Sequence, residues 1–361
     1  MLTSERVLDV SDLWINYKIQ GKDISAVRGI SFSLEEKGVL GVVGESGSGK
    51  SSLGLAIMKL LPKNAETTGT IQFLSADLSK LPKGRMPIYR GTGMTMIFQE
   101  PMTSLNPVMR VSEQLAEAIT IRRERSLGRN PNKPDQVHVY DAASPDGSVN
   151  PLQSRFGMKR TGPSISEQTR KETIEALRTV RITDPERTAG KYPHELSGGE
   201  RQRVMISMAY LLKPKLLIAD EPTTALDVTT QAQILRLMLE LRDEIGTSIM
   251  FISHDLLVVG QVADKIAVVY AGEIVELAPT EKIFGNPLHP YTQGLLNSIP
   301  TSYKGEGRVN PIPLPSQGEI PQLVQGCKFH TRCKRAFGRC SEEEPRLREV
   351  EENHLVSCHL Y

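Results

Sequence analysis

The segment Gly44-Glu45-Ser46-Gly47-Ser48-Gly49-Lys50-Ser51 restricts the fold more than any other stretch of the chain. It fits the pattern of a phosphate-binding loop, follows the short apolar run at 39–43 and opens a helical pattern at 51–61. Glycines let successive backbone N–H groups surround phosphates, Lys50 places a cation on them, and the Ser51 hydroxyl can bind Mg²⁺. The residues expected to contact the nucleotide here are Gly44, Ser46, Gly47, Ser48, Gly49, Lys50, Ser51 and Ser52.

Strand and helix patterns alternate in the second half of the chain. Strands are expected at 216–219, 248–253 and 266–270, with helices at 228–245 and 256–262 between them. Such alternation favours a mostly parallel sheet with helices on both faces, so the fold class is α/β. Residues 7–43 are also rich in strand patterns.

Two stretches lack this periodicity. Residues 126–165 contain several turn-forming sequences such as Asn150-Pro151, and they are expected to form a surface insertion. Every second residue of 310–315 is proline, which predicts a linker into a small C-terminal module.

Two adjacent carboxylates end the apolar run at 216–219. A carboxylate at the end of a buried strand beside a phosphate loop can hold the Mg²⁺ shell, and Asp220 has that position. Because successive strand residues point in different directions, Glu221 can face the attacking water instead. Glu221 is therefore the expected general base or water-orienting group.

A second anion-binding feature lies at 196–204, which reads Leu-Ser-Gly-Gly-Glu-Arg-Gln-Arg-Val. Ser197, Gly198 and Gly199 come at the start of a helical pattern that runs to Leu212. A helix N-terminus offers unpaired N–H groups and a positive dipole end, and the two glycines allow an anion to approach closely.

These three motifs together resemble the ATP-binding cassette ATPases, the motor subunits of ABC transporters. The resemblance covers about residues 5–280. It implies a nucleotide-binding domain at 1–280, with an antiparallel β subdomain beside the mostly parallel core sheet and a helical subdomain at about 100–200. It implies further roles in ATP and Mg²⁺ binding for Gln99, in contact with the γ-phosphate for His254, and in adenine stacking for Tyr17. Ala225-Leu226-Asp227 matches the D-loop of the family.

In that family two cassettes pack head to tail, and the Leu-Ser-Gly-Gly segment of one closes on the ATP of the other. The resemblance therefore implies that Ser197, Gly198, Gly199, Glu200 and Asp227 act on the ATP of a partner. The chain has one cassette, so the partner is expected to be a second subunit, a paralogue in a heterodimer. Closure on ATP and opening after hydrolysis is the expected power stroke.

All four cysteines lie near the C-terminus, as Cys327, Cys333, Cys340 and Cys358. Four clustered cysteines in a chain expected to be cytosolic suggest a metal site before disulfides. Four thiolates suit either a [4Fe–4S] cluster or tetrahedral Zn²⁺, although the C-x2-C spacing usual for zinc is missing. Mixed ligation with His330, His354 or His359 stays open, as do buried cysteines without metal and disulfide pairing.

The C-terminal segment resembles the extension of the oligopeptide/dipeptide-permease ATPase subunits. The matching segments are Asn286–Thr292, Leu295–Pro300, Gly318–Pro321 and Gly326–Cys333. Members of this family import peptides, some import nickel chelates or oligosaccharides, and the cysteines hold an Fe–S cluster in some of them. The resemblance implies a four-cysteine module within 281–361, with a structural or redox-sensing role.

Composition narrows the function classes. A net charge of +2 and an aromatic content of 5% argue against a nucleic-acid surface. No apolar run approaches the ~18 residues that span a bilayer, and no signal peptide is evident. The family resemblance implies a peripheral ATPase at the cytoplasmic face of the membrane. It also implies two integral membrane permease subunits and an extracytoplasmic substrate-binding protein as partners. The alternative is a soluble, non-transport cassette ATPase; a phosphate-loop kinase would leave 196–202 unexplained.

Overall fold

The computed structural model describes residues 5–99, 104–126, 166–224, 226–298 and 324–361. The chain forms two compact units. The first comprises Met1–Leu81, Ile218–Glu221 and Ser248–Tyr361, and the second comprises Pro82–Leu217 and Pro222–Thr247. Ala225, the linker at 310–315 and, except for Ser126, the expected insertion at 126–165 lie outside the described residues.

The first unit contains a four-stranded antiparallel sheet in the order β2-β1-β4-β5. Its strands are β1 (Arg6–Ile19), β2 (Lys22–Glu35), β4 (Ala65–Phe73) and β5 (Ala76–Asp77). Leu8 of β1 stands opposite Leu34 of β2 and Phe73 of β4, and all three side chains are buried. One face of this sheet therefore packs into the core, as is usual for antiparallel sheets.

A second sheet of this unit is parallel at its centre. Strand β3 (Val39–Val43) pairs in parallel with β8 (Ser248–Ser253) and β9 (Lys265–Tyr270), so that Val43 stands opposite Ser253 and Val268. All residues of β3 and β8 are buried, as expected for strands covered on both faces. Beyond β8 lies β7 (Leu216–Asp220), whose residues from Ile218 onward belong to this unit. The predicted α/β class with a parallel core is confirmed.

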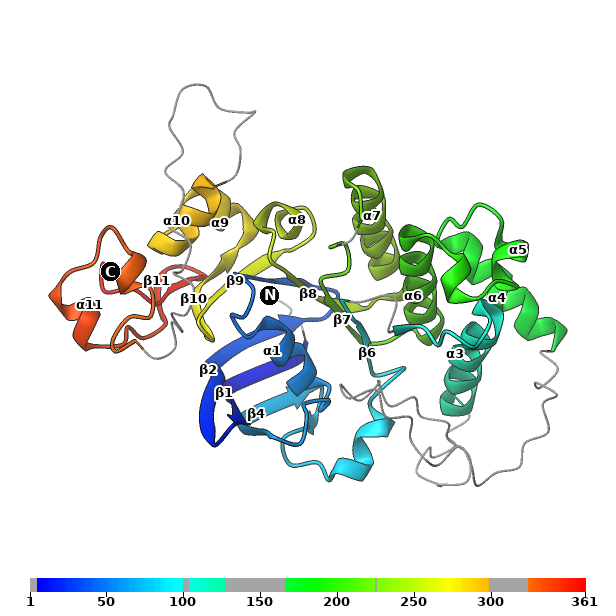
Figure 1. Ribbon diagram of the computed structural model, residues 1–361, viewed down its shortest axis with the longest axis horizontal. Coiled ribbons are helices and arrows are strands. Elements are labelled where there is room, and N and C mark those ends of the chain that lie inside the picture. Colours follow the sequence, from blue (N-terminus) through cyan, green and yellow to red (C-terminus); the bar gives the residue numbers. More distant parts are fainter. Residues whose placement is uncertain (1–4, 100–103, 127–165, 225, 299–323) are drawn as a thin grey trace. The chain divides into compact units, whose positions relative to one another are not determined.

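The other side of this sheet is antiparallel and reaches the C-terminus. Strand β10 (Glu273–Pro279) pairs with β9, β12 (His354–Val356) pairs with β10, and β11 (Arg348–Glu351) pairs with β12. The last two strands of the chain thus extend the core sheet, as Figure 1 shows in red beside the yellow strands. The helical elements of the unit are α1 (Lys50–Ile57), α8 (Leu256–Gly260), α9 (Thr280–Gly285), α10 (Pro290–Asn297), the 3₁₀ turn η5 (His330–Arg332) and α11 (Gly338–Glu342).

The second unit is mainly helical (Figure 1). Its helix α6 (Gly198–Leu212) contacts α3 (Val111–Ser126), α4 (Glu167–Thr179) and α7 (Val228–Ile245). Apolar residues of these helices, including Leu115, Leu177 and Val204, are fully buried and form its core. The remaining elements are the 3₁₀ turns η1 (Lys83–Ile88) and η3 (Pro193–Glu195), the strand β6 (Met94–Ile97) and α5 (Pro185–Ala189).

Candidate functional site

The phosphate loop, residues 44–51, joins the buried strand β3 to helix α1. Two of its glycines lie against backbone carbonyl groups: a Cβ on Gly44 would be 2.0 Å from the oxygen of Val269, and one on Gly49 would be 2.2 Å from that of Ala26. Gly49 also has a φ of 96°. Larger residues at these two positions would displace the loop, which explains why the sequence has glycine there.

Lys50 is buried at the start of α1, with 5% of its surface exposed. Its Nζ donates hydrogen bonds to the carbonyl oxygens of Gly44 and Glu45, each at 2.8 Å. Burial lowers the pKa of Lys50, while the charges of Glu221, Asp220 and Glu45 oppose that shift. The cation is thus held within the loop by groups that a phosphate oxygen can replace.

Ser51 and Asp220 meet directly beside this loop. The Ser51 hydroxyl donates to Oδ1 of Asp220 at 3.1 Å. Burial raises the pKa of Asp220, partly offset by the hydrogen bond from Ser51. A hydroxyl and a carboxylate at this separation form a pair of oxygen ligands of the kind that Mg²⁺ prefers.

Glu221 and His254 form the next pair. His254 Nδ1 lies 3.2 Å from Oε1 of Glu221, whose side chain is nearly buried. The backbone of Glu221 has a φ of 46°, and its N–H donates to the carbonyl of Ile252 at 2.9 Å. A non-glycine residue in the left-handed region is held there by its surroundings, a feature that clusters at functional sites.

Tyr17 of β1 lies near the start of α1. Its hydroxyl is 3.0 Å from Oγ of Ser52. The structure thus brings Tyr17 to the helix that follows the phosphate loop, while its expected stacking on adenine stays a prediction.

Ser197 and Glu200 form a capping box at the start of α6 in the second unit. The Ser197 hydroxyl accepts from the N–H of Glu200 at 3.2 Å, and the Glu200 carboxylate accepts from the N–H of Ser197 at 2.8 Å. This local role of Glu200 was not part of the sequence prediction. The Ser-x-x-Glu spacing at 197–200 could have indicated it.

Asp227 and Gln99 also belong to the second unit. Asp227 caps α7 by accepting from the N–H and the hydroxyl of Thr230, at 2.9 and 2.7 Å. Gln99 follows strand β6. Of the predicted site, the first unit therefore brings together Tyr17, residues 44–52, Asp220, Glu221 and His254, while Gln99, residues 197–200 and Asp227 lie in the second.

The four cysteines line one small cavity in the first unit, together with His289, Phe329, His330, Arg335 and His359. All four are free thiols. Burial raises the pKa of Cys327 to about 11, and burial also raises the pKa values of Cys333 and Cys358. As they stand, the described residues include no group of three or more His, Cys, Asp or Glu side chains arranged to hold a metal ion.

The three histidines considered for mixed ligation have other partners. His354 is buried and lies 2.8 Å from Glu276, His330 Nδ1 lies 2.8 Å from the carbonyl oxygen of Cys327, and His359 Nε2 lies 2.9 Å from that of Glu343. Each of these histidines thus uses one ring nitrogen in a contact with a group other than a cysteine sulfur.

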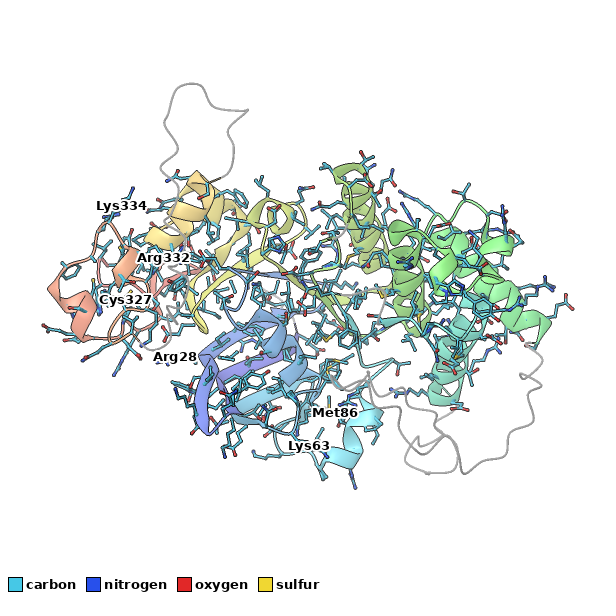
Figure 2. All side chains as sticks on the ribbon, in the orientation of Figure 1. Arg28, Lys63, Met86, Cys327, Arg332 and Lys334 are labelled. Carbon is cyan, nitrogen blue, oxygen red and sulfur yellow. The ribbon has the colours of Figure 1, made fainter. Side chains whose placement is uncertain are left out.

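A contact that the sequence did not indicate joins the cysteine segment to the phosphate loop. Arg332, next to Cys333, donates from Nη1 and Nη2 to the two carboxylate oxygens of Glu45, at 2.9 and 2.8 Å. Figure 2 labels Arg332 and Cys327 on the same C-terminal segment. The two partners are 287 residues apart in sequence, so no local pattern could have predicted the pair.

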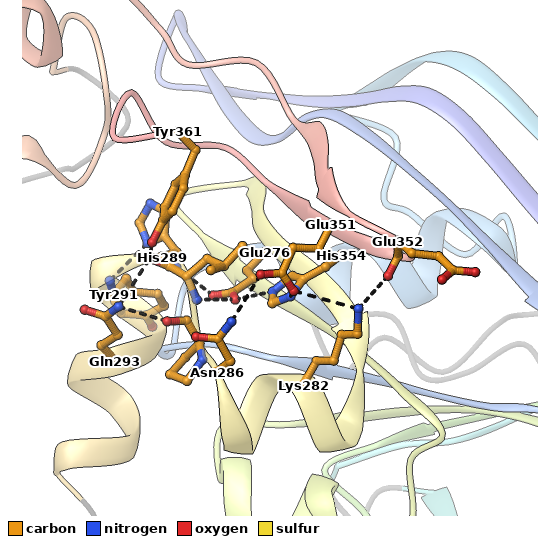
Figure 3. Close-up of polar contacts among 12 residues, drawn as sticks. Glu276, Lys282, Asn286, His289, Tyr291, Gln293, Glu351, Glu352, His354 and Tyr361 are labelled. Carbon is orange, nitrogen blue, oxygen red and sulfur yellow. Dashed lines mark hydrogen bonds and ion pairs between the residues drawn. The ribbon is translucent and has the colours of Figure 1, made fainter.

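A buried carboxylate fastens the end of the chain to the core sheet (Figure 3). Glu276 of β10 is fully buried and accepts from the N–H groups of Leu288 and His289, at 2.7 and 3.0 Å. It also bonds Nε2 of His354 in β12. This node ties β10, α10 and β12 together beside the cysteine cavity.

Comparison with known families agrees with this architecture. The ABC transporter family model matches residues 27–224. The model for the C-terminal region of oligopeptide/dipeptide transporters matches residues 275–340.

Curated relatives match over nearly the whole chain. A probable peptide ABC transporter ATP-binding protein of Sinorhizobium fredii is 41% identical, with 98% of this chain and 95% of the relative covered. The oligopeptide transport ATP-binding protein OppD of Bacillus subtilis is 42% identical over 100% of this chain and 90% of its own length. OppD of Escherichia coli is 38% identical over 98% and 93%.

Solved structures support the fold. A nucleotide-free ATP-binding cassette from an ABC transporter superposes with a TM-score of 0.58 at 24% identity, covering 80% of this chain and 98% of that one. A dimeric cassette bound to ADP and phosphate gives 0.57 at 22%, covering 76% and 98%. Among the described residues, no helix has the length and apolar character needed to cross a membrane. The chain belongs to the ABC transporter family, among the ATP-binding proteins that carry the oligopeptide/dipeptide transporter C-terminal region.

Proposed function

We propose that this chain is the ATP-hydrolysing subunit of an importer of di- and oligopeptides. The observation that carries the proposal is the pairing of Ser51 with Asp220 and of Glu221 with His254 beside a phosphate loop. The relatives named for peptide and oligopeptide transport support the cargo class. We assign residues 1–280 to the nucleotide-binding domain, with its helical subdomain at about 100–200, and residues 281–361 to a C-terminal extension.

In this mechanism the loop residues hold the triphosphate of ATP. Lys50 exchanges the carbonyls of Gly44 and Glu45 for oxygens of the β and γ phosphates. Ser51 and Asp220, with Gln99 as the further ligand that the family resemblance implies, would hold Mg²⁺, and the ion would supply charge neutralisation on those phosphates. Glu221 orients and deprotonates the attacking water, and His254, which Glu221 holds at 3.2 Å, contacts the γ-phosphate.

The ATP site is completed by a second cassette subunit. The ATP bound to that second subunit is faced by Ser197, Gly198, Gly199, Glu200 and Asp227 of this chain. We infer that the second subunit is a paralogue. The helix start at Ser197 fits this role, because the N–H groups of Gly198 and Gly199 lie at the positive end of the α6 dipole, which attracts an anion. Closure of the pair on ATP drives two integral membrane permease subunits, and an extracytoplasmic binding protein delivers the cargo. The chain then lies at the cytoplasmic face of the membrane without crossing it.

Reconstitution in proteoliposomes tests this function. The chain is combined with its partner cassette, the two permeases and the binding protein, and peptide uptake is measured with ATP inside or outside the vesicles. We expect uptake only when ATP is on the cassette side, with hydrolysis stimulated by peptide-loaded binding protein. If only oligosaccharides or nickel chelates stimulate hydrolysis, they are the cargo in place of peptides. If the ATPase activity needs no membrane partner, the chain is better described as a soluble, non-transport cassette ATPase.

We infer that the cysteine cavity holds a [4Fe–4S] cluster bound by Cys327, Cys333, Cys340 and Cys358. Support comes from the four free thiols around one cavity and from the engagement of the nearby histidines elsewhere. The four thiols suit such a cluster in kind, although the described residues do not group them as metal ligands in this structure. Zn²⁺ is the alternative for the same four thiols.

Anaerobic purification decides between the two metals. A cluster gives brown protein with broad absorbance near 400 nm and about four iron atoms per chain, and Cys340→Ser lowers that iron content. Colourless protein with one equivalent of zinc would show that the four thiols bind Zn²⁺ and not an Fe–S cluster. Protein with neither metal would leave the thiols as buried cysteines.

A further inference from the structure

Glu45, the second residue of the phosphate loop, is held at three points. Its backbone N–H donates to the hydroxyl of Tyr291 at 3.1 Å, and its carbonyl oxygen accepts from Lys50. Its carboxylate accepts two hydrogen bonds from Arg332. Two of these three partners, Tyr291 and Arg332, come from the segment that follows residue 280, so that segment fixes part of the loop that holds the phosphates.

Arg332 is itself well fixed. Its side chain is 7% exposed, and Nη1 also donates to the hydroxyl of Tyr270 at 3.2 Å. The guanidinium lies over the rings of Tyr270 and Phe329, at 5.6 and 5.8 Å from their centroids. A planar guanidinium stacked on aromatic rings and paired with both oxygens of a carboxylate is a rigid arrangement that Lys cannot reproduce.

The charge of Glu45 reaches the phosphate site. It is one of three carboxylates whose charges act on Lys50. A carboxylate without a partner at this position would repel the triphosphate. Both groups are negative, and charges in a partly buried site are weakly screened. Removal of one member of such a pair leaves the other charge uncompensated.

We propose that Arg332 is a positioning residue for ATP binding, which neutralises and orients Glu45 so that the phosphate loop accepts the triphosphate. This inference rests on the proposed ATP site and extends it to the cysteine segment. Arg332 precedes Cys333 directly, so the loop that lines the cysteine cavity also sets the affinity of the nucleotide site.

Other contacts hold the C-terminal segment independently of Arg332. Arg28 of β2 binds Glu273 and Glu344, each at 2.9 Å, and Lys328 also pairs with Glu344. Glu276 binds His354. Arg28 therefore provides a matched control. It is a largely buried arginine that pairs with Glu344 of the same segment, and its side-chain hydrogen bonds go to Glu273 and Glu344 and not to Glu45.

The test compares ATP affinity in the full-length chain, measured with a fluorescent ATP analogue, and the KM and kcat of the assembled complex. We expect Arg332→Met to raise Kd and KM about tenfold with kcat changed less than twofold. Glu45→Gln in the Arg332→Met background removes the unpaired charge and should return Kd to within about threefold of wild type. Arg332→Lys should have a Kd between those of wild type and Arg332→Met. Arg28→Met should bind ATP with the Kd of wild type.

Two results would overturn the inference. One is an unchanged Kd in Arg332→Met. The other is a double variant that binds as weakly as Arg332→Met, because a general loss of the C-terminal fold cannot be rescued by Glu45→Gln. Absence of ATP binding in the wild-type chain would instead refute the proposed function, so the two failures are distinguishable.

Discussion

The phosphate loop and the loop at 326–333 lie in the same compact unit, and each depends on a glycine pressed against a carbonyl group. A Cβ on Gly44 would be 2.0 Å from the oxygen of Val269, and a Cβ on Gly326 would be 2.4 Å from that of Cys340. The two loops differ in how their ligands are arranged. The phosphate loop has its polar groups within eight consecutive residues, whereas the cysteines come from positions spread between 327 and 358.

The two regions also differ in how ready their side chains are to bind a ligand. Lys50, Ser51 and Asp220 already make hydrogen bonds that a nucleotide and its metal can take over. Burial raises the pKa of the Cys327 thiol to about 11, which favours the protonated form at neutral pH, so the metal proposed for this cavity would have to displace its proton. The comparison teaches that the fold alone prepares the first region for its ligand, whereas the second region would be completed only by the metal proposed for it.

The largest expected effect separates catalysis from the cysteine region. Glu221→Gln keeps the size of the side chain but cannot accept a proton from water, so kcat should fall about 10²–10⁴-fold. ATP binding should stay within about threefold of wild type, the cassette pair should stay closed on ATP, and the iron content should not change. Single-turnover hydrolysis, gel filtration with ATP and iron analysis measure these three quantities.

Glu240→Gln is the matched control for that substitution, because Glu240 pairs with Arg181 on the exposed surface of α7. It should hydrolyse ATP at the wild-type rate. Near-normal turnover in Glu221→Gln would remove Glu221 from its assigned role, and loss of iron in the same variant would show that the two regions are not separate.

Short-range features of both regions could be predicted from the sequence. The phosphate loop, the strand that precedes it and the helix that it opens lie within about 20 residues, and apolar periodicity together with glycine spacing determines them. Asp220 ends the buried strand β7 and Glu221 follows it, which is why a position beside the phosphate loop could be expected for them; Ser51 bonds Asp220 there.

Long-range contacts could not be predicted in this way. The pairing of β12 with β10 and the pairs of Arg332 with Glu45 and of His354 with Glu276 join residues between 78 and 287 positions apart. Arg, Glu and His are common on surfaces, so their side chains carry no local sign of a buried partner. The sequence therefore indicated a separate C-terminal module, while the structure shows strands of that module completing the core sheet.

The second prediction sharpens the comparison from the side of the cysteine loop. Gly326 has a φ of 69°, and a Cβ there would also lie 2.7 Å from the carbonyl carbon of Ser341. Gly326→Ala should destabilise this loop by about 2 kcal/mol or more, because alanine is strained in the left-handed region and meets the backbone. Hydrogen exchange of residues 324–361 should rise, and the hydrogen bond from Cys327 N–H to the Cys340 carbonyl should be lost first.

Gly338→Ala is the control, since Gly338 begins α11 and a Cβ there meets nothing within 4 Å. It should be neutral or stabilise the helix by up to about 1 kcal/mol. Equal hydrogen exchange in the two variants would contradict a special requirement for glycine at 326. If Gly326→Ala also weakens ATP binding, the contact of Arg332 with Glu45 transmits the change.

The smallest expected effect on stability concerns Asp220, a buried carboxylate whose proposed role in Mg²⁺ binding requires the charge that destabilises the fold. Burial raises its pKa above the ordinary value of 3.8, so the folded protein binds the proton more tightly than the unfolded chain. Such a group contributes stability that is fully present below pH 3.8 and is lost as the pH rises through the folded pKa.

Asp220→Asn keeps an oxygen for Ser51 without the charge, so it should stabilise the nucleotide-free protein by about 1 kcal/mol at pH 7.5, the low end of the cost of burying a polar group. The gain should vanish near pH 3.5, and Mg²⁺-dependent hydrolysis should be lost at every pH. Denaturation curves at the two pH values measure the difference, and an equal gain at both would mean that the charge of Asp220 is not its cause.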